Sequence, residues 1–510
     1  MAELNFNTEE KNQMLVLTTD TVITHDVSEE FTLPDYVPEI RKLLHTRTGV
    51  LPESKYMGDD GENTGLEFSG TVTYLLIYTD DEGQLCSLPL TSNYEAKTVL
   101  SAHPGTVLID TSADSVSARV LAPRKITLKT RLKSRIQSWE MREEKEKIEN
   151  KSAADELFME RRYSEVKSLG IRQVSLGEIK MSDRLDTQGV QSLRPVWCDA
   201  TTVLSEVRAQ NNAVSVRGEA RIKCVCLTDG EALTLTKEIP IVEEIDAQGV
   251  CLGDMARIVA RAVSLSISNE QNGNAEELFF DLSSELEGEV VRNNTCTVTK
   301  DCYSTKYETR EEYKTIEAYT ALRVQNCSFT LSEGVKRKNK EITKIIDVLC
   351  DPVYEKTEFK GGRATILGKA IVTVIGSCQN EDEVLYQAEN YELPFKYSLD
   401  VGGTRAPSVR CVPTIGTVSA RLDGEELRVN AEMYLALGII DKEEVKTLEA
   451  CTLKKDREIK RNAGCVRVYF PKNGDTLWEI AKKYHTTVSL LKEQNSCQGD
   501  ELSGENSLII

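Results

Sequence analysis

Leu66–Thr79 reads LEFSGTVTYLLIYT, a run dense in the β-branched and aromatic side chains that pack well on a pleated sheet. Asp80–Gly83 follows with the sequence DDEG, which has the residue types of a hairpin turn. Gly70 interrupts the run, and a glycine inside a strand indicates a β-bulge or a close approach of the neighbouring backbone. The stretch therefore predicts a β-hairpin whose first strand is constrained at Gly70.

The same pattern recurs twice with a period of about 150 residues. Gly218 and Gly368 lie in alternating runs that align with the Gly70 run. Two further markers keep this period, an entry strand and an arginine that opens a later strand. They occur at Phe31–Leu33, Val174–Leu176 and Phe329–Leu331, and at Arg119, Arg261 and Arg421. Three markers with one period predict three β-rich units, and the turn Leu422–Glu425 predicts a hairpin late in the third.

Length and charge limit the classes of function. A chain of 510 residues is expected to contain about three to five domains. It has 82 Asp and Glu against 63 Lys and Arg, a net charge of −19 that opposes binding to nucleic acid or to anionic lipid. Met1–Asn7 lacks the basic and apolar runs of a secretory signal, and no run is apolar for about 20 residues. We expect a cytosolic protein with no transmembrane segment and no nucleic-acid partner.

Catalytic and metal-binding patterns are missing from the sequence. It has four histidines, each isolated, and no Cys-x-x-Cys, Gly-x-Ser-x-Gly or His-Glu-x-x-His motif. The only tight cysteine pair is Cys224 and Cys226, for which buried thiols are the expectation and a metal the alternative. We predict no catalytic residue, no metal and no cofactor. An enzyme hidden in the repeats would need His103 or a cysteine beside carboxylates in a cleft.

Charged segments separate the predicted units. Residues 139–169 are rich in Glu, Lys and Arg and have the charge pairs of a solvated helix, whereas residues 299–322 alternate more like a strand, so their secondary structure stays open. A basic linker follows the third unit. The predicted boundaries are 1–138, 170–298 and 323–452 for the units, 139–169 and 299–322 for the connectors, 453–465 for the linker and 466–510 for a final domain.

The final domain has its own pattern. Val466–Phe470 is a short β run, and Asp475 or Thr476 can cap a helix in which apolar residues recur at helical spacing. Thr487 can cap a second helix with Leu490 and Leu491 inward, and Ser507–Ile510 can return as a strand. The predicted order is β-α-α-β. The apolar residues of the first helix are Leu477, Ile480, Ala481 and Tyr484.

This final domain resembles a LysM domain, on the residues Gly474–Tyr484 with Leu490, Leu491 and Asn495. It departs from the LysM pattern at Pro471 and in lacking a closing proline. The resemblance implies a shallow groove that holds N-acetylglucosamine chains, between the loop before the first helix and the loop after the second. Its groove residues here are Gly474, Asp475, Thr476, Leu477 and Asn495.

Trp478 lies off the apolar stripe, because it stands about 100° around the helix from its neighbour Leu477. Beside Lys482 and Lys483 it fits a hot spot for a protein partner, since large aromatic residues concentrate binding energy. The alternative is a tryptophan packed on the sheet of a very small core. Trp478, Lys482 and Lys483 are therefore the predicted partner-binding residues.

Phe31–Leu44, with the Gly70 strand and its hairpin, resembles the opening of a SPOCS repeat, a β-rich unit of spore-coat-associated proteins. The leader's two prolines are absent from the second and third copies. Three such units and one LysM domain resemble the SipL-like family of spore coat morphogenetic proteins. The implied fold is mainly β, with three tandem sandwich-like SPOCS repeat domains before a small α+β LysM domain.

The resemblance to this family also implies a role. Its members are non-enzymatic adaptors in the mother-cell cytoplasm, whose LysM domain docks on the morphogenetic ATPase around the forespore and helps to localise the spore coat. The alternative is a protein that binds peptidoglycan or a chitin-type glycan of the cortex or cell wall through LysM.

Overall fold

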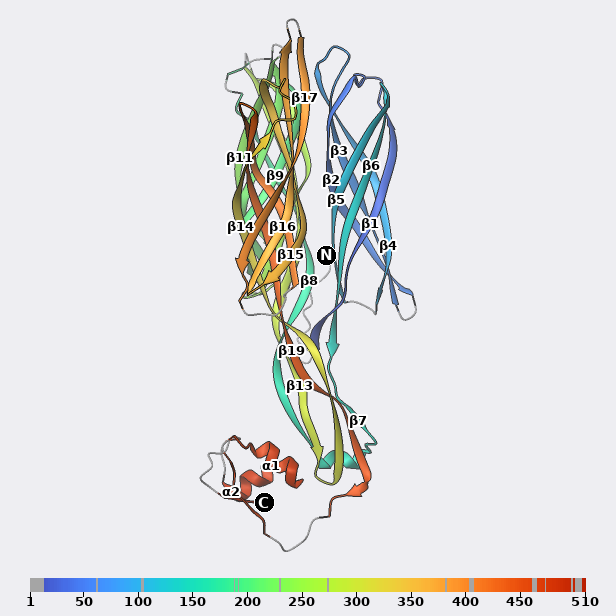
Figure 1. Cartoon of the computed structure of the whole chain (residues 1–510), viewed down its shortest axis with the longest axis vertical. Helices are drawn as coiled ribbons and strands as arrows, with labels where there is room; N and C mark the ends of the chain where they lie inside the picture. The colour runs from blue at the N-terminus through green and yellow to red at the C-terminus, as the bar shows by residue number, and fades with distance from the viewer. Residues whose placement is uncertain are drawn as a thin grey trace.

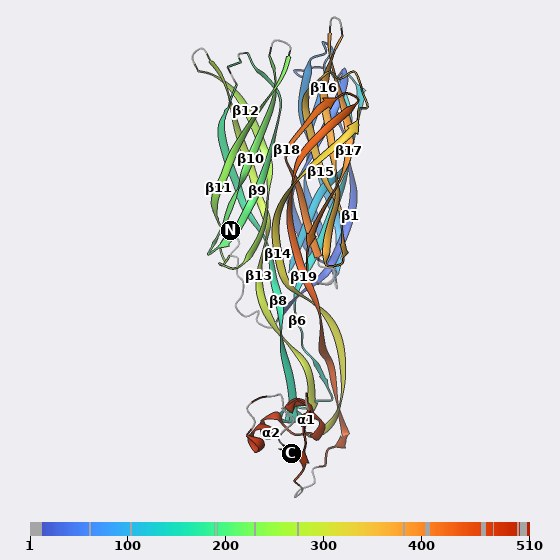
Figure 2. The ribbon, with the colours of Figure 1, turned by 60° about the vertical axis from the view of Figure 1, so that its left-hand side comes forward.

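Three bundles of strands, a stalk and a small helical unit make up the structure, which is a computed structural model. The bundles stand side by side, a narrower stalk of strands continues from them, and two short helices lie at its far end (Figures 1 and 2). The structure describes residues 13–60, 63–101, 105–187, 189–190, 192–228, 231–272, 275–380, 383–402, 408–460, 466–472, 474–496, 499 and 507–510. Met1–Asn7, His103, residues 461–465 of the predicted linker and most of the loop after Asn495 lie outside these residues.

The first unit consists of six strands in two antiparallel sheets. The strands are β1 (Gln13–Thr32), β2 (Lys42–Asp60), β3 (Asn63–Thr79), β4 (Leu85–Ser101), β5 (Thr106–Ala122) and β6 (Lys125–Glu143). The sheet orders are β1-β6-β5 and β2-β3-β4. The predicted turn Asp80–Gly83 joins β3 to β4, and Gly83 adopts the left-handed conformation (φ 77°) that suits glycine.

The second and third units repeat this topology. The second has β8 (Met159–Leu185), β9 (Arg194–Gln210), β10 (Ala213–Thr228), β11 (Glu231–Asp246), β12 (Met255–Asn272) and β13 (Ala275–Ser304). The third has β14 (Tyr307–Lys336), β15 (Lys344–Lys360), β16 (Arg363–Asn380), β17 (Glu383–Asp400), β18 (Ser408–Asp423) and β19 (Glu426–Glu458). Their sheets are β8-β13-β12 with β11-β10-β9, and β14-β19-β18 with β15-β16-β17.

The sequence markers lie on equivalent strands of the three units. The entry strands lie in β1, β8 and β14, the glycines in β3, β10 and β16, and the arginines in β5, β12 and β18. The hairpin predicted at Leu422–Glu425 joins β18 to β19. The turns that the same pattern predicts at Leu227–Gly230 and at Gln379–Asp382 include residues 229, 230, 381 and 382, which lie outside the described part of the chain. The predicted mainly β, sandwich-like fold is confirmed.

The three repeated glycines each face a bulge in the neighbouring strand. Gly70 lies opposite Pro52, where the pairing of β2 and β3 skips Glu53, and a Cβ atom added to Gly70 would lie 2.3 Å from the carbonyl oxygen of Leu51. The other units repeat this arrangement beside bulges at Ser205 and Glu355. An added Cβ atom would lie 2.0 Å from the carbonyl oxygen of Val203 at Gly218, and 2.3 Å from that of Val353 at Gly368. Both reasons predicted for the glycine, a bulge and a close backbone approach, are confirmed.

We predict that Gly70→Ala destabilises the first unit by about 2 kcal/mol or more, because the methyl group must displace backbone and the Tyr94 ring. Gly65→Ala in the same strand is the matched control, since its nearest neighbour would lie 3.8 Å away. Urea unfolding followed by circular dichroism measures both variants. Equal stability of the two variants would contradict the close approach.

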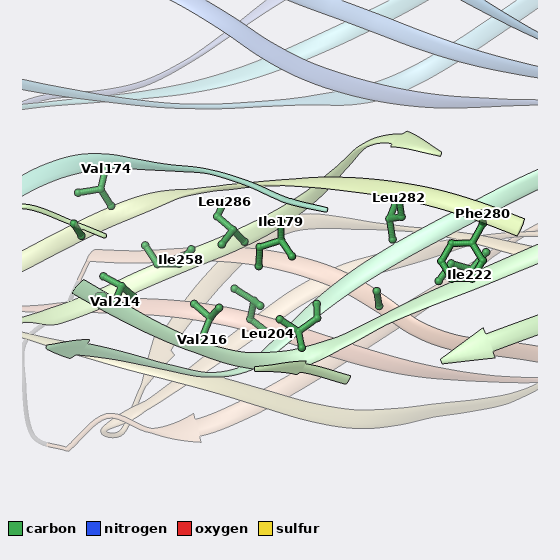
Figure 3. Packing of buried hydrophobic residues seen from close by; sticks show 14 of the residues in the cluster. Val174, Ile179, Leu204, Val214, Val216, Ile222, Ile258, Phe280, Leu282 and Leu286 are labelled. Carbon is green, nitrogen blue, oxygen red and sulfur yellow. The ribbon is translucent and has the colours of Figure 1, made fainter. Parts of the chain in front are cut away.

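Each unit has its own hydrophobic core between its two sheets. Figure 3 shows the core of the second unit, where side chains such as Val216 of β10 and Leu286 of β13 fill the space between the sheets. Both residues are completely buried. Because every second residue of a strand points to the same face, the alternation visible in the sequence is what supplies these three cores.

Apolar side chains from all three units also meet between the bundles, in two clusters. One combines Leu44 of the first unit, Trp197 of the second and Ile346 of the third. Leu44 and Ile346 lie at equivalent bulges, where the strand pairing skips one residue. The other cluster includes Leu15, Trp139, Leu169, Tyr319 and Leu322, in which the Trp139 and Tyr319 rings meet edge to face with centroids 5.0 Å apart. The units therefore share apolar packing and form one head.

The strands β8, β13, β14 and β19 run beyond the head and form the stalk, which comprises residues 147–168, 295–320 and 441–458. A short strand β7 (Lys147–Glu149) pairs with β19, and a 3₁₀ helix spans Ala153–Phe158. Small apolar clusters fill the interior of the stalk, including Val298, Ala318, Cys302 and Leu448. The short connection between β13 and β14, at Thr305 and Lys306, lies at its far end.

The segments predicted as connectors belong largely to this stalk. Residues 299–322 continue β13 and β14, as the alternation suggested, and residues 139–169 contribute to β6, β7 and β8 with only a short 3₁₀ helix. Residues 453–458 of the predicted linker are the last residues of β19. Charge pairs do not keep these segments solvated as helices, because neighbouring strands offer backbone partners to most of their residues.

Candidate functional site

The carboxyl-terminal unit consists of β20 (Val468–Tyr469), α1 (Leu477–Tyr484), α2 (Val488–Asn495) and β21 (Leu508–Ile509), in the predicted order. β20 and β21 pair antiparallel. Thr476 caps α1, because its side chain accepts a hydrogen bond from Glu479 N while the Glu479 carboxylate accepts one from Thr476 N. Thr487 caps α2 by accepting from Leu490 N at 3.1 Å.

The core of this unit is small and takes one residue from the stalk. Leu477, Ile480, Ala481, Leu491 and Leu508 are buried together with Tyr303 of β13. Leu490, predicted to point inward with Leu491, is 37% exposed. Adjacent residues on a helix differ by about 100°, so α2 turns only one of the two leucines fully to the core.

The predicted groove residues mostly shape the loops around the groove. Asp475 accepts hydrogen bonds from the Tyr469 hydroxyl and from Lys472 N, each at 2.8 Å. The hydrogen bond from Lys472 N, with that from Tyr469, lowers the pKa of Asp475. Leu477 is completely buried in the core. Gly474 is exposed with φ 96°, and a Cβ atom there would meet nothing within 4 Å.

Asn495 holds the end of α2 to the last strand. Its Oδ1 accepts from Ile509 N at 2.7 Å, and its Nδ2 donates to Ile509 O at 2.8 Å and to Leu491 O at 2.9 Å. This amide fixes one wall of the predicted groove. The loop after Ser496, which the LysM resemblance assigns to the groove, lies almost wholly outside the described residues.

Two of the three predicted partner-binding residues contact the stalk of the same chain. Trp478 Nε1 donates to Asp301 Oδ2 at 2.9 Å, and the Trp478 ring meets the Tyr303 ring edge to face with centroids 5.0 Å apart. Lys482 Nζ donates to Asp301 Oδ1 at 2.6 Å and to Glu311 Oε1 at 3.1 Å. Trp478 therefore packs beside the small core of its own unit, in part as the alternative expected, and also contacts β13, while its role toward a partner protein stays a prediction.

Further contacts complete this interface, which we call the stalk contact. The Tyr303 hydroxyl, on a residue only 1% exposed, donates to Thr486 O at 2.7 Å. His485 Nδ1 lies 3.3 Å from Ser304 O. Lys483 points elsewhere and lies over the Tyr469 and Tyr484 rings, 5.4 Å from each centroid.

Asp301 is the electrostatic centre of the stalk contact. It accepts from Trp478, Lys482 and also the Tyr313 hydroxyl, which lies 2.8 Å away. Burial favours the neutral acid, but these hydrogen bonds outweigh it and lower the pKa of Asp301. The pKa of Lys482 is raised, because its pairs with Asp301 and Glu311 outweigh the opposing effect of burial. Both groups are therefore charged at neutral pH.

Sequence reasoning missed Asp301, Tyr303 and Glu311, which lie in the segment predicted as a connector. The one available signal was the set of tyrosines at 303, 307, 313 and 319, which are separated by even numbers of residues. That set indicated a strand with a packed face, without indicating its partner.

An apolar surface remains open on the outer face of the small sheet. Val468 and Ile509 are paired across the two strands and are 53% and 46% exposed. Val466 and Phe470, each 75% exposed, flank them along the chain. This outer sheet face and Gly474 are therefore among the exposed parts of the unit, together with α2 residues such as Leu490 and Glu493.

The comparison with known protein families identifies this unit. A family model described as the LysM domain matches residues 472–509. The carboxyl-terminal unit is a LysM domain. No curated protein and no solved structure matches the chain significantly. The LysM domain points to binding of peptidoglycan or a related glycan.

Metal-binding groups and membrane-spanning helices are two further features that would bear on function. Within the described residues, no group of three or more His, Cys, Asp or Glu side chains is placed to hold a metal ion. Among the same residues no helix is long and apolar enough to cross a membrane. The Cys224 Sγ lies 3.0 Å from Cys198 Sγ and 3.5 Å from Cys226 Sγ, and all three are free thiols in or beside the second core.

A cysteine does lie beside carboxylates, in a cavity between the first and third units. Cys411 lines it together with Asp20, Asp110 and Glu355. Burial raises the pKa of the Cys411 thiol to about 12. A nucleophilic cysteine is activated by a lowered pKa, which is the opposite of this shift.

Proposed function

We propose that the chain is a non-enzymatic adaptor of the spore coat, in which the LysM domain attaches to the forespore surface and the three-unit head carries coat material. The observation that carries this proposal is the position of the LysM domain. It is held at the far end of a stalk, remote from the head (Figure 1), and its residues Val468, Phe470 and Gly474 are exposed. A two-ended molecule of this shape suits a tether.

The partner that we propose for the LysM domain is the morphogenetic ATPase implied by the family resemblance, met in the mother-cell cytoplasm. Because Trp478 and Lys482 are engaged by the stalk, the accessible candidates for this contact are Lys483 and the outer sheet face at Val468 and Phe470. Apolar residues that flank exposed aromatic and charged groups are typical of protein interfaces.

The second candidate function is binding of peptidoglycan or a chitin-type glycan, which the LysM match favours directly. The stalk contact leaves its groove loop free, since Gly474 is exposed and space is open around it. The capping of Thr476 and the clamp at Asn495 would hold the groove walls in place for a sugar chain.

Pull-down from sporulating cells tests the adaptor proposal. We expect the tagged full-length chain to retain the ATPase, a truncation before Val466 to lose it, and Phe470→Ser with Lys483→Glu to weaken it. A fluorescent fusion should encircle the forespore only when the LysM domain is present. Equal capture by the truncated and full-length chains would contradict the proposal.

Sedimentation with purified peptidoglycan tests the glycan candidate separately. Gly474→Asn adds a side chain at the groove loop, and asparagine tolerates the left-handed conformation there. We expect this variant to lose sedimentation while it keeps the ATPase. If the full-length chain stays in the supernatant, the glycan candidate is wrong and the adaptor proposal stands.

A further inference from the structure

A cavity of about 460 Å³ lies between the first and third units, remote from the LysM domain. Its walls come from β1, β5 and β6 of the first unit and from β15 and β18 of the third, and Arg261 of β12 reaches it from the second. The volume is in the range of pockets that bind small organic molecules, and such pockets often form where domains meet.

Cationic side chains dominate the polar lining. Arg135, Arg261 and Arg410 each pair with a carboxylate, at 2.8 Å to Asp20, 2.7 Å to Glu287 and 2.5 Å to Asp110. The ion pairs hold these arginine side chains in fixed positions on the cavity wall. The N–H groups that the pairs do not use are therefore also fixed in direction.

Lys133 differs from the three arginines. It is partly buried on the cavity wall, and within the described part of the chain its side chain has no hydrogen bond or ion pair. Its ammonium group can therefore bind an anion without breaking an existing ion pair. It therefore marks the place where a negative group would gain most.

Five cationic side chains line the cavity against three carboxylates, Asp20, Asp110 and Glu355, so the lining carries a net positive charge. Burial disfavours the charged form of Asp110, but Arg410, Arg257 and Arg261 outweigh it and lower the pKa of Asp110 to about 2. This local charge contrasts with the net charge of −19 of the whole chain. The cavity is thus a basic site in an acidic protein, and it selects anions by charge.

Apolar side chains form another part of the wall, beside hydroxyl groups such as those of Thr111 and Ser112. Val22 is 47% exposed, and Tyr354, Val412 and Pro413 line the cavity with it. Inorganic anions gain nothing from such a wall, whereas the body of an organic acid buries apolar surface against it.

We propose that this cavity binds a small organic acid, with its carboxylate on Lys133 and the neighbouring arginines and its apolar body against Val22, Tyr354 and Pro413. The walls belong to separate units, so a bound acid would also bridge them. This site is independent of the function proposed for the LysM domain.

Isothermal titration of the full-length chain with 2-naphthoate tests the proposal, and the neutral 2-naphthamide is the matched probe. We expect the acid to bind at one saturable site. The amide should bind with an affinity at least about 10-fold lower than that of the acid, because a hydrogen bond to a charged group contributes about 1.5–3 kcal/mol. Lys133→Met removes the free charge and should weaken the acid about 10-fold or more. Val22→Trp, on a half-exposed residue, should fill the cavity and abolish binding.

Lys129→Met is the control, because Lys129 lies on the same strand four residues earlier and pairs with Asp26 at 3.0 Å outside the cavity. It should bind the acid as the unmodified chain does. The proposal is wrong if the acid shows no saturable binding, if the amide binds equally well, or if Lys133→Met and Lys129→Met give the same affinity.

Discussion

Asp301→Asn is expected to loosen the LysM domain from the stalk while the three units stay folded. The variant keeps the shape of the side chain but removes the charge that holds Lys482 and accepts from Trp478. A hydrogen bond to a charged group is worth about 1.5–3 kcal/mol, so the docking equilibrium should shift about 10- to 150-fold toward the released form.

Tryptophan fluorescence reports this release cleanly. The chain has three tryptophans, of which Trp139 and Trp197 are 1% and 2% exposed between the units. Trp478 is the one at the stalk contact, so acrylamide quenching should increase in Asp301→Asn. Asp281→Asn, on an exposed residue of the same strand that contacts Ser182, is the matched control and should quench normally. Unchanged quenching in Asp301→Asn would show that the carboxylate does not hold the domain.

The same contact should depend on pH. The pKa of Asp301 is lowered from its ordinary value of 3.8, so its contribution is complete above that value and is lost as the pH falls through the lowered pKa. The pKa of Lys482 is raised from 10.5, so its contribution is complete below that value and is lost as the pH rises through the raised pKa. Between these limits the stalk contact should be insensitive to pH, and Glu311, Tyr313 and His485 are the other titratable groups beside it. Acid should increase quenching of Trp478 in the unmodified chain and have less effect in Asp301→Asn.

The sequence predicted what depends on local periodicity. Strand alternation and the spacing of Gly70, Gly218 and Gly368 indicated three equivalent units, because a bulge opposite a glycine leaves a mark in each copy. The caps at Thr476 and Thr487 and the helical spacing after them indicated the order of the LysM domain. These features are decided within a few residues, so a single sequence carries them.

Features that depend on distant pairing were not predictable in the same way. Periodicity placed Trp478 off the apolar stripe of α1, but its partner Asp301 lies 177 residues earlier. Residues 139–169 carried enough charge to suggest a solvated helix, and their actual structure depends on strand partners such as residues 295–304. The predicted role of Trp478 and Lys482 toward a partner protein would now require release of the stalk contact.

The largest loss of stability is expected from Glu289→Gln. Glu289, 3% exposed, accepts from Arg257 Nε at 2.6 Å and Nη2 at 2.8 Å, and from Arg410 Nη1 at 2.9 Å. Arg410 also binds Asp110, so one buried network joins all three units. Removing the central charge leaves the buried Arg257 guanidinium without its carboxylate partner and leaves Arg410 with Asp110 alone, which costs about 3–5 kcal/mol.

Urea unfolding of Glu289→Gln measures this loss, and Glu287→Gln is the matched control two residues away. Glu287 lies on a more exposed part of β13 and pairs with the half-buried Arg261 of β12. Loss of the Glu287 charge should therefore cost about 1 kcal/mol or less. Because the network joins separate cores, Glu289→Gln should also separate the unfolding of the units into more than one transition.

A triple variant with Arg257, Glu289 and Arg410 all replaced by methionine decides what the network does. If Glu289→Gln is unstable mainly because it leaves buried charges unpaired, replacing all three charged residues by apolar ones should recover most of the lost stability. If the charges fix how the units sit against one another, the triple variant should regain stability yet still unfold in separate transitions. Recovery of a single transition would show that apolar contacts such as Trp139 with Tyr319 suffice to couple the units. A triple variant as unstable as Glu289→Gln would contradict the cost assigned to the unpaired guanidinium groups.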